Sequence, residues 1–191
     1  MGSQWVYTVT YGTEVTTWTV DVTTEETVDS VECYKSSTTF SAPPQRVASG
    51  ISVTVTAAQT WRSEDNLAQY KAIAAINMYS MDVQTTMTDT YTTGTPDFFT
   101  LSNAWTVSEY TVLNPPLAAP STTIYNVTVV GMESVTVTAG TFNCYKIEYS
   151  VAGTVKKTEW WSPDVLGFVK QVSTGTYALP ETQELVSKIL V

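Results

Sequence analysis

WRSEDNLAQYK at residues 61–71 and WWSPDVLGFVK at residues 160–170 are two versions of one stretch, and they indicate how the chain is organised. Trp, Ser, Asp, Leu and Lys occupy the same places in both, without a gap and 99 residues apart. A chain of 191 residues is long enough for one large domain. We therefore predict a single domain over residues 1–191, with an internal repeat of approximately 1–98 and 99–191 whose halves share one interior.

Two further features precede each copy of the repeated stretch. Cys33-Tyr34-Lys35 lies upstream of the first copy and Cys144-Tyr145-Lys146 upstream of the second, while Trp5 and Trp105 open an aromatic strand in each half. The cysteines therefore hold equivalent places in the two halves. They could form a disulfide between Cys33 and Cys144 across a pseudo-twofold axis, or they could be two small buried thiols.

Apolar and polar side chains alternate with a period of two along most of the chain, which is typical of half-buried strands. In the first such segment, Trp5, Tyr7, Val9 and Tyr11 face one way. About ten to twelve short strands follow at a spacing of roughly 8–12 residues, the pattern of an all-β sandwich or barrel. We expect an all-β fold: a curved antiparallel sheet or half-barrel built from two similar halves, with one or two short helical turns.

Residues 70–92 fit two different periodicities. A helix would place Leu67, Tyr70, Ile73 and Asn77 on one face, whereas a strand would alternate Tyr70, Ala72, Ala74, Ile76 and Met78. The matching residues 168–174 of the second copy have the pattern of a strand. We therefore predict that residues 70–92 are mostly strand, preceded by a helical turn that Ser63 caps.

The charge of the chain excludes one class of partner. There are 18 acidic and 9 basic residues, which gives a net charge of −9, and there is no histidine. Such a surface repels phosphate backbones and anionic lipid headgroups, and no basic cluster offers an exception. We expect no binding to nucleic acid.

The sequence contains no apolar run near the roughly 18 residues of a membrane-spanning helix. Trp5 already begins a strand, so the chain does not open with a signal peptide. We expect that a leader or lipid anchor has been removed ahead of Met1-Gly2-Ser3. The Thr-rich, Lys-poor composition suggests an extracytoplasmic location, either secreted or associated with the cell envelope.

No part of the sequence reads as a catalytic or metal site, and we expect neither an enzyme nor a cofactor. Without histidine the chain lacks the commonest general base and zinc ligand, and it has no glycine-rich phosphate loop. Asp65 and Asp164 could act as a carboxylate pair. Their position just after a strand fits turn caps that accept backbone N–H groups better. Asp89 is isolated, and we expect it to be solvated.

Large apolar side chains are more numerous than one thin sheet needs. Most aromatic stripes on strands form a core, but part of this surplus could line a groove for a ligand. The candidate ligand-binding residues are Trp18, Met78, Met81, Trp105 and Trp161. We expect a non-enzymatic binding protein for an apolar small molecule, a lipid or a lipoprotein acyl chain. The alternative is a structural or protein-interaction module of the cell envelope.

The second half resembles a group of secreted or lipid-anchored bacterial β-proteins. The resemblance is carried by Ala139-Gly140-Thr141-Phe142 and by the Trp-x-Ser-Pro-Asp segment that begins at Trp160. Those proteins are similar in fold to the LolA and LolB lipoprotein carriers. The resemblance implies an unclosed antiparallel half-barrel with a hydrophobic concave face and short plugging helices. It implies no catalytic residue.

Overall fold

The computed structural model describes residues 2–48, 50–174 and 180–191, and these residues form strands and turns without a helix. The all-β prediction is therefore confirmed. No helix that could cross a membrane occurs in those three ranges. The thirteen strands are β1 (Gln4–Tyr11), β2 (Glu14–Val28), β3 (Val31–Phe40), β4 (Gln45–Ala48), β5 (Ile51–Ser63), β6 (Gln69–Met78), β7 (Met81–Thr93), β8 (Ala104–Asn114), β9 (Ser121–Val137), β10 (Gly140–Val151), β11 (Thr154–Ser162), β12 (Gly167–Ser173) and β13 (Glu181–Ile189).

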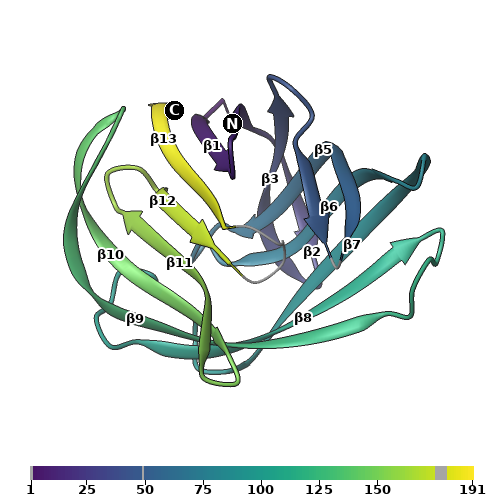
Figure 1. The fold of residues 1–191 in the computed structure, drawn as a ribbon. Helices are drawn as coiled ribbons and strands as arrows, with labels where there is room; N and C mark the ends of the chain where they lie inside the picture. The colour runs from purple at the N-terminus through teal and green to yellow at the C-terminus, as the bar shows by residue number, and fades with distance from the viewer. Residues whose placement is uncertain (1, 49, 175–179) are drawn as a thin grey trace.

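The strands form a closed antiparallel barrel rather than an open half-barrel (Figure 1). Neighbours along the sheet run in the order β3-β2-β1-β13-β12-β11-β10-β9-β8-β7-β6-β5, and β3 pairs with β5 to complete a ring of twelve strands. The expectation of an unclosed sheet was wrong because residues 33–38 pair with residues 58–63. Closure removes the two long edges that a half-barrel would expose. The short β4 lies outside the ring and pairs with the first residues of β5.

Alternating burial explains why these segments are strands. In β1, Tyr7, Val9 and Tyr11 are buried, whereas the threonines between them are more exposed. β-branched threonine suits the outer surface of a pleated wall, and the apolar residues fill the inside. Residues 69–78 and 81–93 form β6 and β7, so the prediction that this region is mostly strand is confirmed.

The two copies of the repeated stretch end in the same kind of turn. Leu67 N–H donates to the Ser63 carbonyl at 2.9 Å, and Leu166 N–H donates to the Ser162 carbonyl at 3.0 Å. Both leucines have positive φ, 59° and 53°. The expected helical turn is thus a single closed turn, not a helix. Its cap is the serine: the Ser63 and Ser162 hydroxyls accept the N–H groups two residues ahead.

Asp65 and Asp164 therefore donate at these turns through their backbones, and the expectation that their side chains accept local N–H groups was wrong. The Asp65 and Asp164 N–H groups lie 3.2 and 3.3 Å from the serine hydroxyls. Both aspartates are exposed. Serine fits the cap because its short side chain reaches the N–H two residues later without disturbing the strand it ends.

Trp61 and Trp160 have matching surroundings. Trp61 Nε1 donates to Glu26, and Trp160 Nε1 donates to Glu133. The ammonium groups of Lys35 and Lys146 lie 5.0 and 5.9 Å from the two ring centres. The common descent of the two halves stays a prediction, but these contacts agree with it.

The cysteines are free, buried thiols on opposite sides of the ring. Cys33 is in β3 and Cys144 in β10, and six strand-to-strand steps separate them in either direction. A disulfide requires α-carbons within about 7 Å, so this arrangement does not allow the Cys33–Cys144 bridge. Burial is the first cause that raises the pKa of Cys144, to about 11, so this thiol stays protonated near neutral pH.

One end of the barrel is filled by aromatic side chains. This end carries the chain termini, which lie side by side (Figure 1), and the turns that follow Ser63 and Ser162. At that end the β7–β8 connection folds inward. Its Phe98 stacks on Trp161, with ring centres 4.4 Å apart, and meets Trp105 edge-on at 5.3 Å. These rings plug one end of the interior.

Candidate functional site

The interior of the barrel contains a cavity of about 700 Å³. Strands β5 to β11 supply most of its wall, because every second side chain of each strand points inward. Its aliphatic part is formed by Val53, Val55, Ile76, Met78, Met87 and Leu113. Val53, Met78 and Val83 also form a small apolar cluster of their own. A volume of this size is typical of a small-molecule site.

An acidic pair lies on the wall of this cavity. Asp89 of β7 and Glu109 of β8 are directly opposite each other in the strand register. Gln69 Nε2 donates to Asp89 Oδ2 at 3.2 Å, whereas Asp89 Oδ1 is buried and has no partner among the described residues. Burial and then Glu109 raise the pKa of Asp89 to about 7. Burial also raises the pKa of Glu109, and Lys157 partly offsets this effect.

A third carboxylate of the cavity wall, Glu159 of β11, is fully engaged by its neighbours. Its Oε2 accepts hydrogen bonds from the Tyr149 hydroxyl at 2.9 Å and from Trp161 Nε1 at 2.8 Å. Its Oε1 lies 3.0 Å from Lys157 Nζ. Burial alone would raise the pKa of Glu159, but Lys157 and Arg62 outweigh it, and the pKa is lowered. Glu159 is therefore ionised and fixed in place.

A smaller cavity of about 220 Å³ lies between β1, β2, β3, β5 and β12. Its lining is mostly aromatic and aliphatic: Trp5, Tyr7, Trp18, Val20, Val22 and Phe168. Arg62 contributes to the walls of both cavities. Its guanidinium lies 5.3 Å from the centre of the Trp161 ring. Arg62 is thus the cationic side chain at the boundary between the two cavities.

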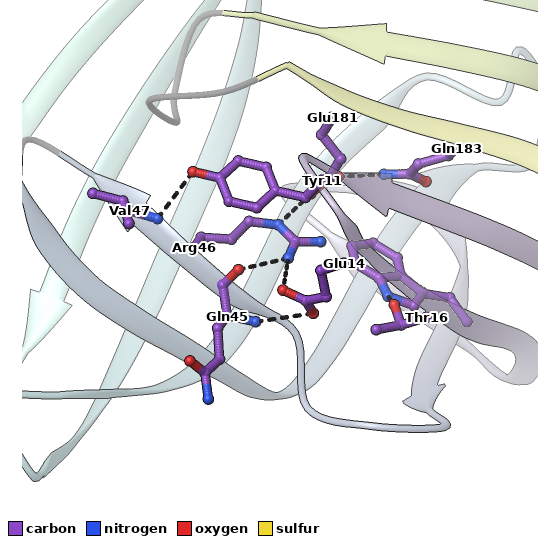
Figure 2. A network of polar contacts seen from close by, with 9 residues as sticks. Tyr11, Glu14, Thr16, Gln45, Arg46, Val47, Glu181 and Gln183 are labelled. Carbon is purple, nitrogen blue, oxygen red and sulfur yellow. Dashed lines mark hydrogen bonds and ion pairs between the residues drawn. The ribbon is translucent and has the colours of Figure 1, made fainter.

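A buried network of ion pairs joins β4 to β2 and β13, as Figure 2 shows. Arg46 Nε lies 2.5 Å from a Glu181 oxygen and Nη1 lies 3.4 Å from Glu14. Gln183 Nε2 donates to Glu181 at 2.9 Å and also lines the smaller cavity. Gln183 therefore connects the network to that cavity from β13, the strand between β1 and β12. It is a structural contact between β4, β2 and β13.

Four of the five predicted ligand-binding residues line a cavity. Met78 and Trp105 line the larger cavity, and Trp18 and Trp161 line the smaller one. Met81 lines neither and is 42 % exposed. The β6–β7 hairpin turns between Met78 and Met81 at the end of the barrel, which leaves Met81 in solvent.

The polar side chains of the larger cavity were missed from the sequence. Asp89 was expected to be solvated, yet it is half-buried beside Glu109 and its Oδ1 atom is shielded from solvent. The alternation of β8 indicated where Glu109 lies, since its side chain is on the same face of the strand as Trp105 and Val107. Arg62 directly follows Trp61 in β5, so the two side chains point to opposite faces of the strand and Arg62 points inward. Within the described residues, no cluster of His, Cys, Asp or Glu could hold a metal ion.

Comparison with known proteins gave one family and two structures. A family model described as DUF3108-like matches residues 3–174. A protein from Parabacteroides distasonis, described as a candidate lipoprotein, is 14 % identical with a TM-score of 0.49, covering 98 % of this chain and 95 % of its own. A candidate exported protein with a YmcC-like fold, from Bacteroides fragilis, is 13 % identical with a TM-score of 0.43, covering 99 % and 96 %. No curated protein matches.

Proposed function

The chain belongs to the DUF3108-like family, and we propose that it is a non-enzymatic, extracytoplasmic binding protein that holds a lipid or another apolar small molecule inside its barrel. The observation that carries the proposal is the 700 Å³ cavity. A binding protein of this kind needs an interior volume of roughly 300 Å³ or more.

The chemistry of the wall supports an amphipathic occupant. Aliphatic side chains such as Met78 and Leu113 offer surface for an alkyl group, whose burial contributes about 25 cal/mol per Å². Asp89, Glu109 and Arg62 line the same cavity and offer partners for a polar group. A ligand with one apolar and one polar part satisfies both regions.

The alternative, a structural or interaction module, has less support. It requires a filled core and partners that bind at sheet edges or loops. The larger cavity leaves part of the interior unfilled, and the β3–β5 pairing closes the ring. The short β4 pairs only with β5 among the described strands, and on its other side the Gln45 and Val47 N–H groups already donate to Glu14 and Tyr11.

A pair of neighbouring alanines in β6 allows a direct test. Ala74 lines the larger cavity, and Ala75 points to the opposite face of the same strand. Ala74→Trp fills part of the cavity, while Ala75→Trp adds the same side chain outside it. The probe is N-phenyl-1-naphthylamine, a neutral apolar dye whose fluorescence rises when it leaves water.

We expect the wild type and Ala75→Trp to bind the dye with the same Kd, and Ala74→Trp to bind at least about tenfold more weakly. Circular dichroism and urea unfolding verify that both variants fold. Equal dye binding by both variants, or no saturable binding by the wild type, contradicts the proposal.

The extracytoplasmic location is tested separately. Cells that express the full gene are fractionated, and the protein is detected with an antibody against the barrel. The proposal expects the protein in the medium or the envelope fraction. Recovery in the cytoplasmic fraction alone contradicts this location and leaves the ligand-binding proposal standing.

A further inference from the structure

Arg62 is placed where a ligand in the larger cavity can reach it. It lies in β5, one residue after the outward-facing Trp61, and its side chain lines both cavities. The guanidinium lies over the Trp161 ring, 5.3 Å from its centre, and donates from Nη1 to the Leu67 carbonyl at 3.1 Å. The cation–π contact and this bond hold the group in place before any ligand arrives.

Most hydrogen-bonding capacity of Arg62 is unused. A guanidinium carries five N–H donors. Among the residues that the structure describes, only the bond to Leu67 is formed, and no carboxylate lies within ion-pair distance. By contrast, Arg46, the other arginine of the chain, contacts two carboxylates. The remaining donors of Arg62 therefore suit an incoming oxygen anion, which a guanidinium binds in bidentate fashion.

The other charges around the cavity leave room for an anion. Lys157 and Glu159 form an ion pair, and Lys156 adds a further positive group. Asp89 and Glu109 are the remaining acids, and burial raises the pKa of both. At a given pH each is therefore less ionised than an exposed carboxyl group, which reduces the negative charge that an anion meets.

We propose that the ligand is a single-chain amphiphile with an anionic oxygen head group, which Arg62 binds, while the alkyl chain lies among the aliphatic side chains of the larger cavity. This inference rests on the proposed function, since it names the ligand class of the same cavity. A fatty-acid carboxylate and a monoalkyl phosphate share the required chemistry, because both present oxygens to a guanidinium fork.

The test compares four probes with the same chain and different head groups: dodecanoate, dodecyl phosphate, dodecanol and dodecyltrimethylammonium. Kd is measured below the critical micelle concentration by isothermal titration calorimetry and by quenching of tryptophan fluorescence. Each probe is titrated into the wild type, Arg62→Gln and Arg62→Lys. Lys71→Gln is the matched control, because it removes one positive charge beside Trp61 on the outer face.

We expect the wild type and Lys71→Gln to bind dodecanoate or dodecyl phosphate at least about tenfold more tightly than dodecanol. Arg62→Gln should lose that preference and still bind dodecanol. Arg62→Lys, which keeps the charge but not the fork, should lie between them. Tighter binding of dodecanoate would indicate a fatty acid as the natural ligand, and tighter binding of dodecyl phosphate would indicate a monoalkyl phosphate.

Several results overturn the inference. They are unchanged anion binding by Arg62→Gln, equal binding of dodecanol and both anions by the wild type, and preference for dodecyltrimethylammonium, which would assign the head group to Asp89 and Glu109. If Arg62→Gln fails to fold, the wild-type ranking of the probes and the Arg62→Lys data decide. Failure of all four probes and of the neutral dye contradicts the proposed function itself.

The position of the chain has its own control. Ala58 of β5 pairs with Ala74 of β6 in the register, but Ala58 lines the smaller cavity and Ala74 the larger one. We expect Ala74→Trp to weaken dodecanoate binding and Ala58→Trp to leave it unchanged. The reverse result overturns the placement of the chain in the larger cavity.

Discussion

The Arg62 guanidinium lies 5.3 Å from the centre of the Trp161 ring, and these two residues hold the same place in the two copies of the repeated stretch. One copy supplies a cation and the other supplies the aromatic face that it stacks on. Arg62 also lines both cavities, while Phe98 stacks on Trp161 at 4.4 Å. The contact between Arg62 and Trp161 therefore lies at the boundary between the two cavities, next to the aromatic plug.

Phe98 should contribute strongly to stability, because it packs between Trp105 and Trp161 inside the barrel. We expect Phe98→Ala to lower the free energy of unfolding by about 3–4 kcal/mol, through lost burial and a new cavity. Phe99→Ala is the control. Phe99 is half-buried and meets Tyr145 edge-on, so its loss should be smaller. Urea unfolding measures the free energy of unfolding of both variants. Equal losses would contradict the role of Phe98 in plugging this end of the barrel.

The buried carboxyl of Asp89 should make stability depend on pH. Its pKa of about 7 in the folded state exceeds the ordinary value of 3.8, so the folded protein keeps a proton that the unfolded chain releases. Raising the pH from 4 to 7 therefore lowers the free energy of unfolding, and this loss reaches its full size above pH 7. Asp89→Asn removes this cost and should stabilise the protein by about 2–4 kcal/mol at pH 8, with little effect at pH 4.

The exposed Asp65→Asn variant is the control for this pH effect. Unfolding by urea at pH 4, 6 and 8 gives the free energies for all three proteins. A destabilising effect of Asp89→Asn at pH 8, or a gain of the same size at pH 4, contradicts the assignment of a protonated Asp89 near neutral pH.

Glu159 should be sensitive to loss of its charge, because Lys157, Tyr149 and Trp161 all contact its carboxylate. We expect Glu159→Gln to cost about 2–3 kcal/mol, since Lys157 is partly solvated and loses less than a fully buried partner. The half-exposed pair Lys170–Glu184, 2.8 Å apart, provides the comparison. Glu184→Gln should change the free energy of unfolding by under about 1 kcal/mol.

The Arg46–Glu181 pair should show strong coupling. Each single substitution, Arg46→Met or Glu181→Gln, removes this buried ion pair, although Arg46 keeps Glu14 and Glu181 keeps Gln183 as partners. The double variant should be less destabilised than the sum of the two single losses, by about 1–3 kcal/mol. Additive losses in a thermodynamic cycle contradict the role of this pair in holding β4 to β13.

The sequence predicted the local structure of the barrel well. Alternation identified strands from Trp5 onward, and the strand pattern of the second copy favoured strand over helix in residues 70–92. Ser63 was predicted as a cap, and its hydroxyl accepts the Asp65 N–H. These features depend on neighbours a few residues apart, so a local pattern is enough to indicate them.

Closure of the sheet was not predictable in the same way. It depends on pairing between β3 and β5, where Cys33 is opposite Ser63. Alternation shows that both segments are strands but does not determine which strands pair. The resemblance to open half-barrels pointed to the other outcome, and the same closure places the two cysteines on opposite walls.

The candidate site was predictable in its apolar part only. Four of the predicted residues, including Trp105 and Met78, line the cavities because surplus aromatic and sulfur-containing side chains on strands face inward. Asp89 was missed because an isolated acid in a Thr-rich strand looks solvated. Its burial depends on Glu109 and Gln69, which other strands bring beside it.

An amphiphile inside the barrel should remain bound when the protein is purified gently. Native mass spectrometry of the protein purified without detergent from its own host detects such a ligand, with dodecanoate added to a stripped sample as the positive control. We expect an extra mass of lipid size that organic extraction removes and that Ala74→Trp does not retain. A bare protein mass, under conditions where added dodecanoate stays bound, would contradict it.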